Sequence, residues 1–309
     1  MKLGSEAYVL TWDRLRVFAA VARHGSVRAA AETLHITGPA VSQHLHRLEK
    51  EAGCSLVEPD GRGIRLTHAG RVLAASAQAM VDAAARAELD LTNLGGLVVG
   101  PLRIGAVASA LRSVVPRVLQ SLTDRHPRLE PEVSDGEAAQ MIPALHAGQL
   151  DAVVMESWTH APARTPPGIA TSTLVLEDAL VAVPTEHPLA HLASVPLTAL
   201  RGEVWTSCPP GSDAHEALIR LLHRFEENRA SVRYCVADYA TQLQLVAASL
   251  AVALVPRMAA AHTPEGVQLI PCRPAVTRTV AVATVRGAET PPIQAFLAEM
   301  ERSCRSRQP

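Results

Sequence analysis

In the first part of the chain the apolar positions recur with the period of an α-helix, in short segments separated by polar turns. From Trp12 onward, apolar residues fall at i, i+3, i+4 and i+7, which predicts a helix. Gly25 is placed to end this helix, and Ser26 is placed to cap the next one. The alanine-rich stretch Val27–Leu34 then predicts a second, short helix.

A third helical pattern follows after a turn of about three residues, a spacing typical of helix pairs. Thr37 can cap this helix, and Pro39 lies in its first turn. Val41, Leu45 and Leu48 share one side of the helix. The other side carries Pro39, Ser42, Gln43, His46 and Lys50. Two short helices that cross closely over small alanines predict a helix-turn-helix.

Two further elements are predicted before residue 100. The segment GRGIRLT (61–67) predicts a short hairpin with basic residues at its tip, and a long helix is predicted from 68 to 94. The apolar residues of that helix step by 7, 4, 3, 4 and 3 positions along Leu73, Met80, Ala84, Ala87, Leu91 and Leu94. This narrow stripe favours a dimer seam, and packing against the helix's own domain is the alternative.

After Gly100 the pattern changes to short β-rich runs that alternate with helical runs. The predicted strands are 102–107, 129–133, 150–155, 179–183, 203–207, 231–237, 251–256 and 267–271. The predicted helices between them are 110–124, 136–147, 212–228 and 239–249. The fold class is therefore α/β, and a segment of this length favours two lobes over one.

Composition narrows the class of protein further. The chain has 309 residues, 48% of them apolar, and no apolar run is long enough to cross a bilayer. The N-terminus does not resemble a signal peptide, and the five cysteines lack CxxC spacing, so a reduced, cytoplasmic protein is expected. The net charge is −1, whereas residues 1–71 hold ten Lys and Arg against seven Asp and Glu. The predicted helix-turn-helix part therefore has a mild positive bias.

The stretch 15–70, LRVFAAVARHGSVRAAAETLHITGPAVSQHLHRLEKEAGCSLVEPDGRGIRLTHAG, resembles the N-terminal signature of LysR-type transcriptional regulators. The segments GPLRIGAV (100–107), GQLDAVV (148–154), ALVAVPTEHPLA (179–190) and LQLVAASLAVALVP (243–256) resemble the effector domain of the same family. The resemblance implies a winged helix-turn-helix, a dimerising linker helix and a two-lobed α/β effector domain like type 2 periplasmic binding proteins.

The implied domains are an extension (1–11), a DNA-binding domain (12–68), a linker helix (69–97) and an effector domain (98–309). Lobe 1 would hold about 101–176 and 273–305, and lobe 2 about 177–272. The chain departs from the family pattern at three places. Gly38 stands where glutamine is common, Val57 and Pro59 replace a usual Phe and Arg, and Ser249 and Ala251 replace usual glycines.

The resemblance implies double-stranded DNA as a partner, with the third helix in the major groove. Gln43 can pair with adenine, Ser42 with several bases, and Pro39 can pack on a thymine methyl group. His46 lies within reach of a base or a phosphate. Gly38, at the start of the helix, removes one side chain able to read a base, and the remaining candidates suit phosphates. The full set of candidate DNA-binding residues is Ser26, Thr37, Gly38, Pro39, Ser42, Gln43, His46, Arg47, Arg62 and Arg65. A homodimer or homotetramer would read a site with dyad symmetry.

A small-molecule effector is expected between the two lobes, and the sequence does not identify it. The candidate effector-binding residues are Ser109, Val183, Pro184, Thr206, Ser207 and Asp238. Ser109 follows a strand and opens a helix, a position that suits a small anion. We expect no other cofactor, no metal ligand, no catalytic residue and no membrane partner. RNA polymerase is a further candidate partner.

Three alternatives remain open at this point. The chain could be a redox-responsive regulator of the same fold that uses Cys208, with Cys235 as the other candidate thiol. It could be a member with weakened DNA reading that acts through partners, given Gly38 and Pro59. It could also be a solute-binding protein, which would need a signal peptide and would lack the helix-turn-helix.

Overall fold

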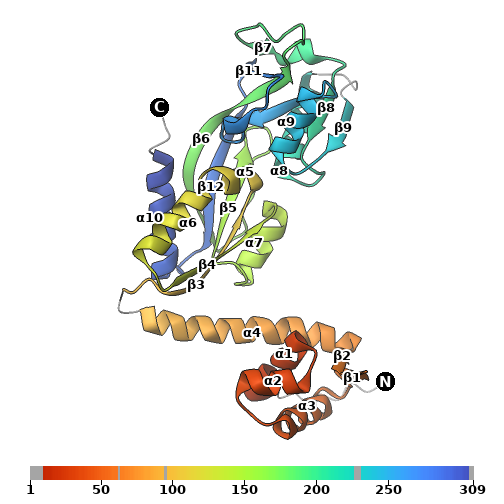
Figure 1. The fold of residues 1–309 in the computed structure, drawn as a ribbon, viewed down its shortest axis with the longest axis vertical. Helices are drawn as coiled ribbons and strands as arrows, with labels where there is room; N and C mark the ends of the chain where they lie inside the picture. Colours follow the sequence, from red (N-terminus) through yellow and green to blue (C-terminus); the bar gives the residue numbers. More distant parts are fainter. Residues whose placement is uncertain (1–9, 62, 94–95, 226–230, 306–309) are drawn as a thin grey trace. The chain divides into compact units, whose positions relative to one another are not determined.

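The polypeptide folds into two units, Met1–Leu91 and Thr92–Pro309, in a computed structural model that describes residues 10–61, 63–93, 96–225 and 231–305. The first unit is drawn in red to orange in Figure 1. Its elements are α1 (Trp12–His24), α2 (Val27–Leu34), α3 (Gly38–Ala52), β1 (Val57–Asp60), β2 (Gly63–Leu66) and α4 (His68–Asn93). The three predicted short helices are therefore confirmed.

The hairpin of the first unit is longer than the sequence predicted, because its first strand starts at Val57 and not at position 61. Glu49 on α3 explains the early start. Its carboxylate accepts hydrogen bonds from the backbone N–H groups of Leu56 (2.8 Å) and Val57 (3.2 Å). The N–H of Ile64 donates to the carbonyl of Gly25 at 3.1 Å, so this hairpin, the wing, is also fixed to the turn between α1 and α2.

The long helix α4 confirms the predicted element, but its apolar residues divide between two surroundings. Ala77 is fully buried, and Leu73 packs against the same core of α1, α2 and α3. Met80 and Leu91 are 51% and 68% exposed. Leu94, the last residue of the predicted seam, lies outside the described residues. The first turns of the stripe therefore belong to the core of their own unit, and the later turns leave large apolar side chains exposed.

The second unit contains all the remaining elements. Its helices are α5 (Ala108–Ser113), α6 (Val115–Arg125), α7 (Ala138–His146), η1 (Leu197–Leu200), α8 (Asp213–Phe225), α9 (Tyr239–Ala247), η2 (Arg257–His262) and α10 (Pro291–Arg305). Its strands are β3 (Gly100–Ala106), β4 (Leu129–Asp135), β5 (Ala152–Trp158), β6 (Ile169–Pro184), β7 (Val195–Pro196), β8 (Val204–Ser207), β9 (Ser231–Cys235), β10 (Val252–Pro256), β11 (Val267–Arg273) and β12 (Thr277–Val285). These elements confirm the α/β class.

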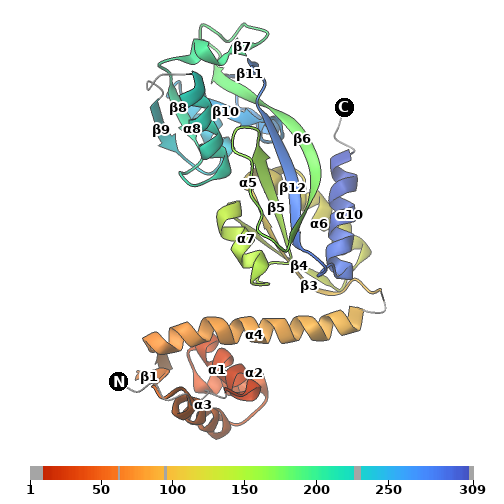
Figure 2. The ribbon, with the colours of Figure 1, turned by 180° about the vertical axis from the view of Figure 1, so that it is seen from behind.

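The second unit has two separate hydrophobic cores, which we call lobe 1 and lobe 2. The lobe 1 core lies around β3, β5 and β12, and the lobe 2 core lies around β8, β10 and α9. The strands follow the order β4-β3-β5-β12-β6-β10-β8-β9; β11 also pairs with β6, and β7 pairs with β11. In lobe 1, α6 and α10 cover one side of the strands and α7 covers the other (Figures 1 and 2).

Strand β6 runs through both lobes and is much longer than predicted, because the sequence pattern identified only its second half. Only three of its first ten residues are buried, and its polar residues interrupt the apolar run that marks a fully buried strand. Its first half pairs with β12, and its second half pairs with β10 and β11. The predicted helix 110–124 is likewise two helices, and the second one starts at Val115 with Pro116 in its first turn.

Candidate DNA-reading face and effector site

Helix α3 separates its side chains sharply into a buried side and an exposed side. Val41 and Leu48 are fully buried and Leu45 is 6% exposed, so the helix is anchored along one face. The predicted base contacts Pro39, Ser42, Gln43 and His46 lie on the opposite, exposed face, and so does Arg47, a predicted phosphate contact. The structure therefore brings these candidates together on one solvent-facing surface, which we call the α3 face.

Two of the candidate phosphate contacts are also helix caps. The Ser26 hydroxyl accepts a hydrogen bond from the Ala29 N–H, and the Thr37 hydroxyl accepts one from the Ala40 N–H, each at 3.4 Å. Because each hydroxyl acts as the acceptor in these bonds, its own proton remains free to donate to another acceptor. A surface hollow of about 650 Å³ between α2, the start of α3 and the wing brings Ser26 and Gly38 together.

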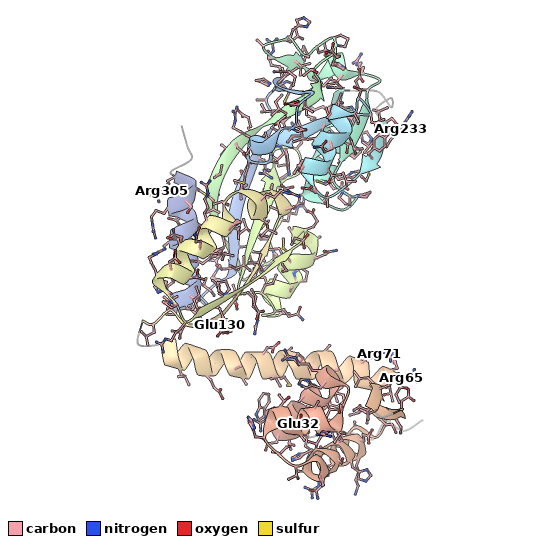
Figure 3. The ribbon with its side chains drawn as sticks, in the orientation of Figure 1. Glu32, Arg65, Arg71, Glu130, Arg233 and Arg305 are labelled. Carbon is pink, nitrogen blue, oxygen red and sulfur yellow. The ribbon has the colours of Figure 1, made fainter. Side chains whose placement is uncertain are left out.

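The wing contributes one basic side chain among the described residues. Arg65 is exposed on β2 and forms an ion pair with Glu58 on the facing strand, with 2.8 Å between Nη2 and the carboxylate. Figure 3 shows Arg65 and Arg71 close together at this end of the unit. Arg62 lies outside the described residues. An exposed ion pair of this kind contributes little to stability, so Arg65 can exchange Glu58 for a phosphate.

Gly38 has open space around it. A Cβ atom at this position would meet no heavy atom of the described residues within 4 Å, and the φ angle of Gly38 does not lie in the left-handed region. The glycine is therefore not required by packing, and the helix start could hold a larger side chain.

In the second unit, a cavity of about 250 Å³ lies between the lobes and holds two of the predicted effector residues, Ser109 and Asp238. Asp238 caps α9 and forms an ion pair with Arg112 across the lobes at 2.9 Å. Burial alone would raise the pKa of Asp238, but hydrogen bonds from Ala240 and Thr241 and the charge of Arg112 lower it. The Ser109 hydroxyl accepts a hydrogen bond from Arg278 at 2.8 Å, so it is already engaged.

A second, much smaller cavity of about 10 Å³ holds two more predicted residues, Thr206 and Ser207. Both are buried at the end of β8. The Ser207 hydroxyl lies 3.1 Å from Nδ1 of His215, whereas the Thr206 hydroxyl has no hydrogen-bond partner among the residues that the structure describes. Trp158 and Tyr239 also line this cavity.

The other two predicted effector residues lie elsewhere. Val183 is fully buried within β6 and pairs with β11. Pro184 lines a different hollow with Gly202 and Val204, at the start of β8, whereas Thr206 and Ser207 lie at its end. The structure does not bring these two residues together with the other four.

Sequence reasoning missed a buried ion network at the junction of the lobes. Arg278 on β12 is fully buried and donates to the carboxylates of Glu156 on β5, at 2.7 Å, and Glu177 on β6, at 2.9 Å. Its guanidinium also lies 5.9 Å from the centre of the Trp158 ring. The Met258 backbone N–H donates to Glu177 at 2.6 Å, which ties lobe 2 to the network. A charged residue inside each apolar strand run was the signal that could have revealed this network.

Two further carboxyl groups of this region have strongly shifted pKa values. Burial, followed by the charges of Glu156 and Asp213, raises the pKa of Glu137 to about 7. Burial, followed by the charges of Glu156 and Glu216, raises the pKa of Asp213 to about 6. Glu137 precedes α7 in lobe 1, and Asp213 begins α8 in lobe 2. Acidic groups from both lobes therefore repel each other across their junction.

Replacing Glu137 with glutamine should stabilise this unit near pH 8 and leave its stability almost unchanged near pH 4. Because the pKa of Glu137 is raised from its ordinary value of 4.5 to about 7 in the folded state, the folded state binds more protons than the unfolded state between these two pH values, and stability falls as the pH rises through that window. Glutamine does not titrate, so the variant does not lose stability as the pH rises. Urea unfolding at both pH values measures the difference, and an equal difference at the two pH values would contradict the prediction.

Comparison with known proteins decides the family. A model of the LysR substrate binding domain matches residues 95–305, and a model of the bacterial regulatory helix-turn-helix protein, lysR family, matches residues 12–71. The chain belongs to the LysR family. As in the family, a helix-turn-helix domain precedes an effector-binding domain, and the chain is a DNA-binding transcriptional regulator of LysR type.

Several relatives and solved structures are similar to this LysR-type chain. A probable hydrogen peroxide-inducible genes activator of Streptomyces viridosporus is 30% identical over 279 residues, which cover 89% of this chain and 88% of that protein. A RuBisCO operon transcriptional regulator of Allochromatium vinosum is 32% identical over 221 residues, 72% of this chain and 70% of that protein. Full-length CbnR complexed with its target DNA shares the fold, with a TM-score of 0.67 at 22% identity over 95% of this chain and 100% of that one.

Among the helices that the structure describes, none combines the length and apolar character needed to cross a bilayer.

Proposed function

We propose that this LysR-type regulator reads its target sequence with Ser42, Gln43 and His46 on the α3 face. The observation that carries this proposal is the division of α3 into a buried apolar side and an exposed polar side. The major groove admits one helix and presents base-specific donors and acceptors. The Gln43 amide suits adenine, the Ser42 hydroxyl suits several bases, and Pro39 can contact a thymine methyl group.

The surrounding residues would fix the register of the helix on the duplex. Arg47 and Arg65 are exposed basic groups, and Ser26 and Thr37 hold hydroxyls at helix starts, where N–H groups attract phosphate. The exposed Met80 and Leu91 of α4 favour pairing with a second copy of the chain. A homodimer, or a homotetramer built from two, would then read two half-sites about one helical turn apart.

The effector would act from between the lobes, near Ser109, Thr206, Ser207 and Asp238. Binding there would change how the lobes approach each other and so change the packing of subunits on DNA. A coupling of about 1–3 kcal/mol between the two sites is enough to alter DNA affinity severalfold. Such a regulator works where the chromosome is, in the bacterial cytoplasm, and RNA polymerase is a further partner that we propose. This role needs no catalytic site and no further cofactor.

A pull-down of genomic DNA fragments with the purified protein, at low and at high salt, tests the reading function. Phosphate contacts alone give binding that falls steeply as salt increases, so only sites that are read by sequence should survive. A few surviving fragments with dyad symmetry support the proposal. Uniform binding that high salt removes would refute sequence reading by this chain.

That second outcome would favour a member with weakened DNA reading that acts through partners. Gly38 lacks a side chain at the start of the reading helix, and Pro59 lies in β1 opposite Ile64. The open space at Gly38 makes a direct test available. Gly38→Gln should fold normally and, if reading is weakened there, should increase the number of salt-resistant fragments.

A redox role through Cys208 is the other alternative, and the hydrogen peroxide-inducible name of a relative is the observation that favours it. The Cys208 thiol itself is poorly suited to react with peroxide. Cys208 is 4% exposed, and burial together with the charges of Glu156 and Glu137 raises its pKa to about 12. At neutral pH only about one thiol in 10⁵ would then be a thiolate, the form that reacts with peroxide.

We therefore expect Cys208→Ser to leave any response to hydrogen peroxide unchanged. DNA affinity of the wild-type protein and the variant, measured before and after peroxide treatment, provides the comparison. Cys235 is exposed, so Cys235→Ser is the matched control for nonspecific thiol chemistry. Loss of a peroxide response in the Cys208 variant alone would restore the redox interpretation.

A further inference from the structure

The larger cavity of the second unit, of about 250 Å³, is lined by elements from both lobes. Helices α5 and α6 form its lobe 1 side, and α9 and η2 form its lobe 2 side. At about 30 Å³ for each water molecule, this volume holds about eight of them. The cavity of about 10 Å³ beside Thr206 holds no more than about one. Of these two cavities, the larger one is therefore the one that can take a small organic ligand.

The charged side chains that line the larger cavity leave a surplus of positive charge. They are Arg112 on α5, Arg117 on α6 and Asp238 at the start of α9, so two positive charges face one negative charge. Arg117 is exposed and has no ion-pair partner among the residues that the structure describes. An anion with a single negative charge would therefore balance the charge of this wall.

Arg112 has hydrogen-bond donors left for a ligand although it is paired with Asp238. Its Nε and Nη2 atoms each lie 2.9 Å from a carboxylate oxygen of Asp238, so the pair is bidentate and joins the two lobes. A guanidinium carries five N–H donors, and this pair uses two of them. Arg112 can therefore donate to a second carboxylate without leaving the first.

Asp238 is also held in place by its own helix. Its carboxylate accepts hydrogen bonds from the Ala240 N–H at 3.3 Å and from the Thr241 N–H at 3.2 Å. The Thr241 hydroxyl donates to it at 3.1 Å. These bonds do not depend on Arg112, so sharing the arginine with a ligand leaves the Asp238 carboxylate satisfied.

Most of the remaining wall of this cavity is apolar. Its apolar members are Pro116, Ala240, Met258, Ala259 and Ala261. The hydroxyls that line it are already engaged: Ser113 donates to the Ser109 carbonyl at 2.7 Å, and the Ser109 hydroxyl accepts from Arg278 at 2.8 Å. A hydrocarbon group covers such a surface favourably, whereas a small inorganic anion leaves it in contact with water. The wall therefore favours a carboxylate with an apolar body.

Other ligand classes suit the larger cavity less well. A cation would meet the surplus of positive charge, and a sugar would find few free hydroxyls. Among the described residues, no three His, Cys, Asp or Glu side chains are grouped so that they could hold a metal ion. The neighbouring carboxylates Glu156 and Glu177 are both paired with Arg278, and neither lines the cavity. A small organic anion is the class that fits both the charge and the volume.

We infer that the effector is a small monocarboxylate with an apolar body, whose carboxylate binds between Arg112 and Arg117 and whose hydrocarbon part packs on Met258 and Ala259. The inference rests on the proposed role of the second unit as a ligand sensor, and it adds the chemical class of the ligand and its place. Because α6 belongs to lobe 1 and η2 to lobe 2, the bound ligand bridges the lobes.

The test uses the purified full-length protein and three probes at equal ionic strength: hexanoate as the carboxylate, hexanamide as its neutral equivalent of the same size, and hexylammonium as a cation. Calorimetry and thermal unfolding measure binding. We expect hexanoate to bind and to raise the melting temperature, because a ligand that binds only the folded state stabilises it. Hexanamide should bind about tenfold more weakly, because it cannot form a charge-assisted pair with arginine. Hexylammonium should not bind.

Arg117→Gln should weaken hexanoate binding by about tenfold, and folding should be unaffected because Arg117 is exposed. Arg128→Gln is the matched control, because Arg128 is also an exposed arginine and does not line the cavity. It lies just before Glu130, at the end of lobe 1 that is away from the lobe junction (Figure 3). The control should bind hexanoate as the wild type does.

Asp238→Asn should change hexanoate affinity in the opposite direction. Asparagine caps a helix as well as aspartate does, so α9 keeps its start. The substitution removes the negative charge from the cavity wall and releases Arg112 for the ligand. Hexanoate should therefore bind about two- to fivefold more tightly. Absence of hexanoate binding, equal binding of hexanamide, unchanged affinity in the Arg117 variant, or unchanged or weaker affinity in the Asp238 variant would each overturn the inference.

A DNA-binding assay on the sites from the genomic pull-down separates this inference from the proposed function. If hexanoate binds with the expected dependence on Arg117 and Asp238 but does not alter DNA affinity or footprint, the ligand class is correct and control of DNA binding from this cavity is refuted. If hexylammonium binds and alters the footprint while hexanoate does not, ligand control is correct and the carboxylate class is refuted.

Discussion

Replacing Arg278 with methionine should lower the free energy of unfolding of the effector-binding unit by about 3–5 kcal/mol. The guanidinium is fully buried and satisfies Glu156, Glu177 and the Ser109 hydroxyl at once. Methionine fills much of the same volume but leaves two buried carboxylates without a cation. The loss therefore comes from uncompensated charge and not from a cavity. Urea unfolding followed by circular dichroism measures it.

Two controls isolate the cause. Arg286→Met removes an exposed arginine just beyond the same strand and should change stability by less than about 0.5 kcal/mol. Combining the Arg278 change with Glu156→Gln and Glu177→Gln removes the unpaired charges and should recover much of the lost stability. If the single Arg278 variant is as stable as the wild type, the network does not hold the lobes in the arrangement described here.

The second large effect is expected on DNA reading. Gln43→Ala should reduce affinity for the specific site by about 1–3 kcal/mol, while binding to unrelated DNA should stay the same. Gln43 is exposed and does not contribute to the core of the first unit, so folding should be unaffected. Fluorescence anisotropy with the recovered site and with a scrambled duplex gives both affinities.

Arg47→Ala is the matched comparison on the same helix face. Because Arg47 is a proposed phosphate contact, its loss should weaken binding to both duplexes alike. It should also reduce the slope of log affinity against log salt concentration by about one. Equal losses on both duplexes for the Gln43 variant would show that this side chain positions the protein and does not read bases.

The first unit could be predicted in detail because its determinants are local. Ser26 and Thr37 cap helices where the sequence placed them, and the apolar spacing of Val41, Leu45 and Leu48 set the buried side of α3. The start of the wing was missed because it depends on Glu49, a side chain eight positions before Val57. No local pattern encodes that bond.

The effector site could be predicted only in part, because its geometry depends on contacts between distant strands. Thr206 and Ser207 followed from their place at the end of a strand, and the structure puts both beside one cavity. The charged partners at the lobe junction are far apart along the chain. Arg278 lies 122 residues after Glu156 and 101 residues after Glu177. Such pairings can be predicted only when the order of the strands in the sheet is known, and β12 was not among the predicted strands.

The continuity of β6 has a consequence for how the two lobes can move. Up to Asp178 its partner is β12, and from Ala179 onward its partners are β10 and β11. Since one backbone passes through both lobes without a loop, their relative motion must be taken up as twist and bend of hydrogen-bonded strand. Amide hydrogen exchange at Glu177, Asp178 and Ala179 should therefore report lobe movement directly, and ligand binding should slow exchange there before it changes exchange at the outer ends of the strand.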